Sequence, residues 1–166
     1  ALGTALKENN IEIVKLLLNN EKIDVNIIIK YDASFFQYKD KEDFNAWYEG
    51  TLLYLAIKIG NIEIIKLLLE NDKIDVNIKT KIFEYSIEYY DDHDDNYQKL
   101  EYKAEEKKEE KSYISPLHLA VKKGNLEVIN LLMHHKGIDL NVKDEQGKTP
   151  IDYASTEEIK QLLKKI

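Results

Sequence analysis

The sequence predicts a mainly α-helical solenoid of about 3.5–4 stacked helix-turn-helix units that carries two extended hairpin-like insertions. Three observations support this class. One stretch of 18 residues occurs three times without gaps, starting at Asn9, Gly60 and Gly124. A second helical pattern with its own start signal precedes the later copies. Long segments rich in aromatic residues then separate one copy from the next, and these segments alternate like strands.

The repeated stretch is clearest in its second copy, which reads GNIEIIKLLLENDKIDVN over Gly60–Asn77. Asn61 suits the N-cap of a helix, because its side chain can accept a bond from the first turn. Gly60, Gly124 and Asn9 occupy the preceding position, where a left-handed residue ends a helix. The apolar positions form a stripe too broad for one neighbour to cover, so the copies are expected to stack. These positions are Ile62, Ile64, Ile65, Leu67, Leu68 and Leu69.

A shorter helix is expected before each copy. The two prolines of the chain, Pro116 and Pro150, follow Ser115 and Thr149, so each stands at the first helical position, where its missing N–H does no harm. Thr51 keeps the cap without the proline. Each unit therefore consists of two helices joined by a tight turn.

These motifs resemble the ankyrin repeat. The family's T-P-L-H-x-A core is seen as Ser115-Pro116-Leu117-His118-Leu119-Ala120, and the G-N-x-E-x-x-x-x-L-L run and the terminal D-V-N are also present. The resemblance covers roughly residues 1–26, 51–77 and 115–163. It implies an array of helix-turn-helix units with hairpin-like fingers between them, and a non-enzymatic protein-binding module without catalytic residues.

We expect one domain over residues 1–166. The aligned alanines Ala5, Ala56, Ala120 and Ala154 are 51, 64 and 34 residues apart, against a family period of about 33. The extra residues of the first two intervals enlarge two of the fingers. The predicted parts are repeat 1 (1–26), its finger (27–50), repeat 2 (51–77), its finger (78–114), repeat 3 (115–148) and a C-terminal capping repeat (149–166). Because the chain begins inside a unit, we expect a longer array before it; a degenerate first repeat is the alternative.

The fingers are predicted to form strands. In the first, Ile27–Tyr31 is β-branched, and Phe44 and Trp47-Tyr48 suit either a strand or a helical turn. In the second, Phe83–Tyr89 alternates apolar and polar residues, a polar break follows, and Leu100–Ala104 alternates again, as in a long hairpin. The charges of residues 104–111 favour a solvated helix or a disordered stretch instead.

The amino-acid composition limits the classes of partner that the chain is expected to bind. The net charge is −7 and the sequence contains no arginine, which argues against nucleic acid and suits a protein partner with a basic surface. The finger segments 27–50 and 78–114 carry net charges of −2 and −4. There is no cysteine, which favours a cytoplasmic, intracellular setting. No apolar run reaches about 18 residues, so we expect no membrane insertion.

The sequence contains only weak candidates for a metal site or a catalytic site. Asp92, Asp94 and Asn96 fit the start of an EF-hand loop, but Tyr97 and Lys103 stand where glycine and the closing glutamate are needed. We therefore predict no metal site. His134 and His135 are adjacent and point apart. We expect no cofactor and no catalytic set.

Other polar motifs are better explained by structure. His118 stands at the family's T-P-L-H histidine, which implies hydrogen bonds to neighbouring backbone rather than catalysis. The Asp24/Asn26 pair recurs as Asp75/Asn77 and Asp139/Asn141, and a pattern locked to the repeat indicates turn hydrogen bonds.

The aromatic residues are the most informative signal. Fourteen of the sixteen Phe, Trp and Tyr residues lie in the two fingers. Such residues dominate interface hot spots, although a long hairpin also needs them for its own cross-strand packing, and both interpretations stay open. The candidate partner-binding residues are Tyr38, Trp47, Tyr48, Tyr85, Tyr89, Tyr90 and Tyr97 in the fingers, with Lys58, Ile59, Lys122, Lys123, Lys143, Glu145, Gln146 and Lys148 on the concave face.

The sequence thus predicts a non-enzymatic protein–protein interaction module or scaffold, either monomeric or weakly self-associating. One alternative is a purely structural or self-pairing repeat segment of a larger protein. Another is the targeting arm of an enzyme whose catalytic part lies outside these residues.

Overall fold

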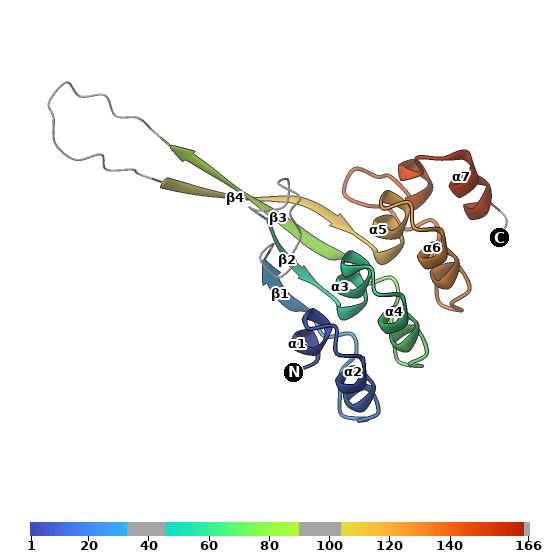
Figure 1. Ribbon diagram of the computed structural model, residues 1–166. Coiled ribbons are helices and arrows are strands. Elements are labelled where there is room, and N and C mark those ends of the chain that lie inside the picture. The colour runs from blue at the N-terminus through green and yellow to red at the C-terminus, as the bar shows by residue number, and fades with distance from the viewer. Residues whose placement is uncertain (33–45, 90–103, 165–166) are drawn as a thin grey trace, which may run out of the picture.

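The computed structural model of the chain describes residues 1–32, 46–89 and 104–164. Two rows of helices lie side by side, and a twisted antiparallel sheet extends from the row formed by α1, α3 and α5 (Figure 1). The helices are α1 Leu2–Lys7, α2 Ile11–Leu18, α3 Leu52–Ile59, α4 Ile62–Leu69, α5 Pro116–Lys122, α6 Leu126–Met133, the 3₁₀ helix η2 Pro150–Tyr153 and α7 Glu157–Leu163. The strands are β1 Ile29–Asp32, β2 Ala46–Gly50, β3 Thr80–Tyr89 and β4 Ala104–Ile114.

The outer helices α2, α4 and α6 begin as the sequence predicts. Each follows an asparagine whose side-chain oxygen accepts the backbone N–H three residues on. These bonds join Asn10 to Ile13 (3.1 Å), Asn61 to Ile64 (2.9 Å) and Asn125 to Val128 (3.1 Å). The residue before each cap is left-handed, with φ of 55° at Asn9, 86° at Gly60 and 66° at Gly124. The tight turn between paired helices is therefore confirmed in all three copies.

The core is continuous from one unit to the next. Leu6, Leu53, Ile65, Leu117 and Ile129 are each 0% exposed and belong to a single buried cluster. The inner helices α3 and α5 are buried along most of their length, because each packs against its own outer helix and against the inner helices of neighbouring units. The mainly α, stacked architecture predicted from the repeat is confirmed.

The Asp/Asn pairs form the turn bonds that the sequence predicts. The backbone N–H of Asn77, for example, donates to Asp75 Oδ1 at 2.9 Å. The asparagine side chain also reaches the following unit, where Asn77 Nδ2 donates to Gly137 O (2.7 Å) and Asp139 N donates to Asn77 Oδ1 (2.9 Å). Asn26 makes the equivalent pair of bonds to the loop of the second unit. Successive units are thus joined by a polar bridge as well as by apolar packing.

The two fingers form one antiparallel sheet in the order β1-β2-β3-β4. Within the fingers, β1 pairs with β2 and β3 with β4, and the pairing of β2 with β3 joins the fingers to each other. At this junction Trp47 lies opposite Phe83 and Glu49 opposite Lys81. The base of the sheet is buried against the helices through Tyr48, Thr80 and Ile114.

Two expectations for the fingers need correction. Residues 104–111 belong to β4, neither helical nor disordered, because residues 104–110 pair one for one with β3 and the ladder resumes at Ser112 after a register shift at Lys111. Trp47-Tyr48 lies in β2, which excludes the alternative of a helical turn. Leu100, the polar break at 91–96 and the tip of the first finger lie outside the described residues.

The last unit differs from the others. Its first helix is shortened to the 3₁₀ turn η2, although Thr149 and Asp152 still form a capping box at its start. Ile159 and Leu163 of α7 are buried, whereas Glu157, Glu158 and Lys160 are exposed. This amphipathic helix gives the end of the stack a polar outer side.

Candidate interaction surface

The inner-helix face consists of the C-terminal ends of α3 and α5 and the short finger 142–148 beside η2. All eight sequence-predicted candidates on this face are at least partly accessible, and Glu145 and Gln146 are among the exposed ones. Lys58 and Ile59 are half-buried, and Lys122, Lys123, Lys143 and Lys148 are exposed. The helices α3 and α5, which carry or adjoin four of these candidates, lie in the row of helices from which the sheet extends (Figure 1).

Contacts to backbone and rings hold the lysines of α3 and α5 in place. Lys58 Nζ donates to the Tyr48 hydroxyl at 3.0 Å and lies 4.8 Å from the centre of its ring. Lys123 Nζ donates to Lys58 O at 3.2 Å, linking the ends of the two helices. This link also places a cation near the last carbonyls of α3, which the helix dipole favours.

Tyr48 must be removed from the set of contact residues. Its side chain is 1% exposed and stacks on Tyr31, with ring centres 5.2 Å apart. Burial of Tyr31 raises the pKa of its phenol, with smaller contributions from Tyr54 and Tyr48. The face of the sheet that carries Tyr48 packs on the helices, so this aromatic residue serves the internal packing that the sequence left as an alternative.

Tyr153 is the centre of a second cluster, which the sequence did not single out. Lys122 Nζ and Lys148 Nζ lie 5.2 and 5.4 Å from the centre of its ring. Its hydroxyl donates to Asp144 Oδ2, and this bond, followed by burial, raises the pKa of Tyr153 to about 12. The Tyr153 ring thus holds the ammonium groups of Lys122 and Lys148 at one edge of the inner-helix face.

Asp144 organises the short finger. Its Oδ1 accepts the backbone N–H groups of Gln146 (2.8 Å) and Lys148 (2.9 Å). Partial burial raises the pKa of Asp144, but the bonds from Tyr153, Lys148 and Gln146 outweigh it and leave the pKa below its usual value. The exposed side chains of this finger therefore project from a loop with a defined backbone.

His118 has the structural role that the sequence predicts. It is 0% exposed; its Nδ1 lies 2.8 Å from Ser115 Oγ and its Nε2 lies 3.1 Å from Lys148 O. Burial lowers its pKa, which favours the neutral imidazole. The ring ties the start of α5 to the short finger.

The base of the second finger adds two lysines that sequence reasoning missed. Lys79 Nζ donates to Lys143 O at 2.7 Å and lies 5.5 Å from the ring centre of Tyr113, and Lys81 Nζ lies 5.8 Å from the same ring. In the sequence, the signal that could have identified these two lysines is their position at the start of the long finger. Only the pairing of β3 with β4 reveals that Tyr113 lies beside them.

The remaining candidates lie on the sheet or beyond the described residues. Trp47 is in β2, and Tyr85 and Tyr89 are in β3, where they pair with Lys108 and Ala104 of β4. Tyr38, Tyr90 and Tyr97 lie outside the described residues, as does the acidic break considered as a cation site. Within the described ranges, no group of three or more His, Asp or Glu side chains is placed to hold a metal ion.

Among the described helices, none combines the length and apolar character needed to cross a bilayer.

The fold and its inter-unit bridges define the class of the protein: a solenoid of stacked helix-turn-helix repeats. Family models described as ankyrin repeats (3 copies) and ankyrin repeats (many copies) match residues 1–80 and 106–154. The chain belongs to the ankyrin-repeat family.

Curated relatives agree with this assignment. The chain is 30% identical over 165 residues to the ankyrin repeat protein FPV022 of Fowlpox virus (strain NVSL), an alignment that covers 92% of this chain and 28% of the relative. It is 28% identical over 102 residues to alpha-latrocrustotoxin-Lt1a of Latrodectus tredecimguttatus, covering 61% and 5%. It is 41% identical over 56 residues to the human transient receptor potential cation channel subfamily A member 1, covering 31% and 5%. The chain thus spans less than a third of the length of each of these relatives.

Proposed function

We propose that the chain is a non-enzymatic scaffold module that binds a protein partner with its inner-helix face and the adjoining sheet. Ankyrin repeats are in general protein–protein interaction modules. The observation that carries the finer proposal is the set of lysines that tyrosine rings and backbone carbonyls hold on the inner-helix face and at the adjoining base of the second finger. Side chains held in one geometry lose less entropy when a partner binds.

The charge distribution supports a partner with two kinds of contact. The acidic excess of the finger segments, −2 and −4, favours a basic surface opposite the sheet. Lys122 and Lys148 are accessible cations beside the Tyr153 ring, so carboxylates of the partner would lie there. Complementary charges of this kind increase the association rate and the specificity more than the affinity.

Affinity capture followed by mass spectrometry tests the proposal. The bait is the chain itself, compared with a trimmed version in which Asn-Gly turns replace residues 33–45 and 85–108. This trimming keeps Tyr48, Thr80 and Ile114, which are buried at the base of the sheet. A partner captured by the intact chain and lost from the trimmed version supports use of the fingers, and undiminished capture contradicts it.

A charge-reversal variant tests the helical part of the surface. K122E/K148E is expected to weaken binding of the captured partner by about tenfold or more, because two contacts change sign. K160E on α7 is the matched control, since it reverses an exposed lysine at the end of the stack. Equal losses in both variants would mean that overall charge, not this face, governs binding.

Self-association through the sheet edge is the second candidate. In the described sheet β1 and β4 are edge strands, which can pair with another copy. However, seven of the eleven residues of β4 are charged, and charged edges oppose such pairing. We therefore propose a monomer, and light scattering over a concentration series tests it.

A cytoplasmic location is also part of the proposal, and fractionation of cells that produce the tagged chain tests that location.

A further inference from the structure

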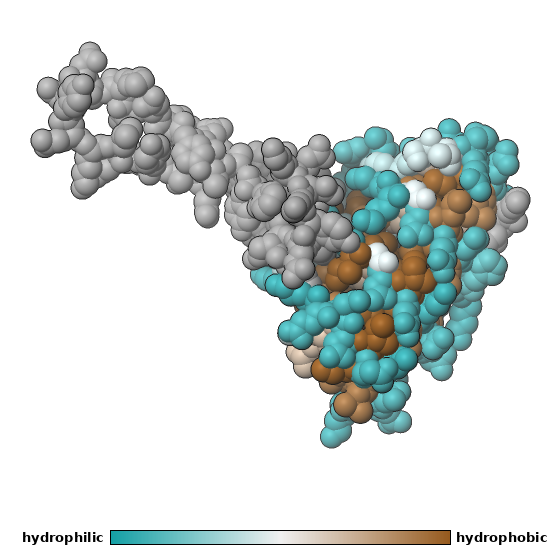
Figure 2. All heavy atoms as spheres, viewed as in Figure 1, coloured by the Kyte–Doolittle hydropathy of each residue, from teal (hydrophilic) through white to brown (hydrophobic). Residues whose placement is uncertain are grey.

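Lysines and tyrosine rings gather around the short finger 142–148. We call Lys79, Lys81, Lys122 and Lys148 the lysine cluster. Two of the ammonium groups lie near the ring of Tyr113 and the other two near that of Tyr153. Burial lowers the pKa of His118, and the charges of Lys79 and Lys122 lower it further, so the two halves of the cluster lie within electrostatic reach of one buried ring. Figure 2 shows mainly hydrophilic residues where Figure 1 places this finger, beside α5.

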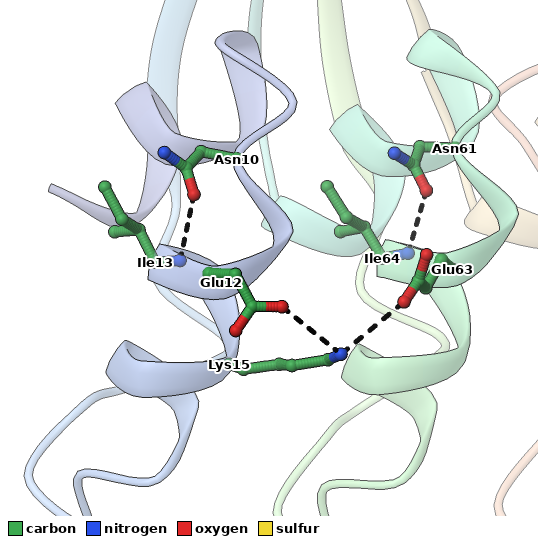
Figure 3. Close-up of polar contacts among 7 residues, drawn as sticks. All are labelled: Asn10, Glu12, Ile13, Lys15, Asn61, Glu63 and Ile64. Atoms are coloured by element: carbon green, nitrogen blue, oxygen red, sulfur yellow. Dashed lines mark hydrogen bonds and ion pairs between the residues drawn. The ribbon is translucent and has the colours of Figure 1, made fainter.

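Lysines of the outer helices have different partners. Lys15 Nζ lies 3.8 Å from Glu12 Oε1 of its own helix and 3.5 Å from Glu63 Oε1 of the next (Figure 3). Lys66 Nζ likewise lies 3.0 Å from Glu127 Oε1. Among the described residues, by contrast, no carboxylate oxygen lies within 4.0 Å of an ammonium group of the lysine cluster. A partner can therefore neutralise the cluster without first displacing a carboxylate of this chain.

Three carboxylates of the same region are engaged in other interactions. Asp144 accepts two backbone N–H groups of its own finger and one tyrosine hydroxyl. Asp152 Oδ2 accepts the backbone N–H (2.7 Å) and the hydroxyl (2.8 Å) of Thr149 at the start of η2. Glu49, which faces the cluster from β2, lies 2.9 Å from Lys30 Nζ. Hydrogen bonds and a separate ion pair thus hold these carboxylates, and the cations of the cluster stay available.

Two residues of the cluster region depart from the pattern of the repeat. Lys148 precedes the cap of η2 and is exposed, and Tyr153 follows that cap by four residues and is half-buried. In the two preceding repeats the equivalent positions are buried and carry no charge and no ring. They are Gly50 and Ile114 before the cap, and Leu55 and Leu119 after it. Stacking of the units therefore does not require a lysine and a tyrosine here, which points to a role in binding.

We propose that the lysine cluster binds an acidic peptide segment of the partner, an extended run of aspartate or glutamate side chains that lies across the short finger. This inference rests on the proposed function and names the chemistry that the partner presents at this surface. Cations divided between two rings suit several successive carboxylates better than one phosphate, because Coulomb attraction falls with distance from a single point. The sequence also contains no arginine, the residue whose planar fork matches phosphate groups, whereas lysine is a point charge with rotatable donors.

The probe is a fluorescein-labelled peptide of about eight glutamates, roughly 26–29 Å long when extended. Fluorescence anisotropy measures its binding to the intact chain. Although the net charge of the chain is −7, the peptide is expected to bind at least about tenfold more tightly than the same peptide made of glutamines. Raising the salt concentration from about 0.05 M to 0.3 M is expected to weaken binding by about fivefold or more. Equal binding of the two peptides would overturn the proposal.

Paired variants locate the binding on the cluster. K79Q/K81Q and K122Q/K148Q each remove the cations of one ring, and each is expected to weaken binding of the glutamate peptide by about tenfold. K136Q/K160Q is the matched control, because it removes the same charge from two exposed lysines outside the cluster, and it is expected to change binding by less than about twofold. Thermal midpoints within about 2 °C of the intact chain show that the variants are folded. Equal losses in all three variants would overturn the proposal.

Two further outcomes would also overturn it. One is a neutral peptide with a single phosphoserine that binds the chain more tightly than the glutamate peptide, since the cluster would then be a phosphate site. The other separates this inference from the proposed function. If the glutamate peptide does not bind, yet K122E/K148E still weakens binding of the captured partner, the proposed function stands and the acidic segment is wrong. Displacement of the captured partner by the glutamate peptide supports both.

Discussion

At the scale of single residues, one asparagine side chain holds neighbouring units together. The backbone N–H of Asn77 donates a turn bond to Asp75 Oδ1, and its side-chain amide donates to Gly137 O and accepts from Asp139 N of the next loop. A neutral amide suits this position because it carries a donor and an acceptor together. The recurrence of Asp and Asn predicts the turn, but the bridge is invisible in the sequence because its partners lie 60 and 62 residues away.

The first prediction concerns this bridge. N77A is expected to lower the free energy of unfolding by about 1–3 kcal/mol, because two hydrogen bonds between units are lost. N141A is the matched control, since Asn141 has the same place in its turn and its side chain bridges no unit in the described structure. Urea unfolding followed by circular dichroism measures both. Equal losses would mean that the turn, and not the bridge, accounts for the effect.

The second prediction is a pH dependence that arises from His118. Burial lowers the pKa of the imidazole in the folded chain, so the unfolded chain binds a proton more readily below about pH 6.5. Stability is therefore expected to be full above about pH 7 and to decrease as the pH falls from about 7 to 5. H118Q removes the titrating group and is expected to flatten this part of the profile, although its stability at pH 7 is lower. H134Q, at the exposed C-cap of α6, is the control, and an unchanged slope in H118Q would contradict the assignment.

At the scale of elements, helices of nearly the same sequence differ in burial because of their neighbours. IEIVKLLL in α2 and IEIIKLLL in α4 differ at one position, yet Ile13 is 43% and Ile64 1% exposed. Sequence periodicity therefore predicts that the helices exist and which stripe is apolar. It does not predict how much of that stripe is covered.

This contrast gives the third prediction. I64A is expected to cost about 2–5 kcal/mol of unfolding free energy, because it leaves a cavity between α2 and α4. I13A removes the same atoms from a half-exposed side chain and is expected to cost less than about 1 kcal/mol. Urea unfolding of the two variants makes the comparison. Similar costs would show that Ile13 is also covered in solution.

The sheet marks the limit of prediction at this scale. Alternation predicts β3, but the pairing of β2 with β3 joins two fingers separated by a whole repeat, and local patterns carry no information about such a partner. The charges of β4 favour a solvated segment, yet its backbone pairs with β3 over ten positions. Tyr48 is a contact candidate in the sequence because aromatic residues dominate interface hot spots, whereas alternation shows only that the two faces of a strand differ. It does not show which face the helices cover.

At the scale of the whole molecule, the helical solenoid and the distal hairpin are two distinct parts of the structure. The distal halves of β3 and β4 extend away from the helices (Figure 1), whereas the base is buried through Thr80 and Ile114. A solenoid is stabilised mainly by contacts between adjacent units. The base of the sheet contributes to such contacts, whereas the described distal strands, 85–89 and 104–108, pair with each other.

The fourth prediction follows from this separation. Replacing residues 85–108 by an Asn-Gly turn is expected to leave the thermal midpoint of the helical signal within about 2 °C of the intact chain. The reason is that, within the described sheet, residues 85–89 pair with 104–108 and with no other strand. I114A, which changes a side chain that is 2% exposed at the base, is expected to cost about 2–5 kcal/mol. Circular dichroism at 222 nm measures both variants. A large loss in the shortened chain would show that the distal hairpin packs on the stack, and the hairpin would then no longer be available as a separate surface for a partner.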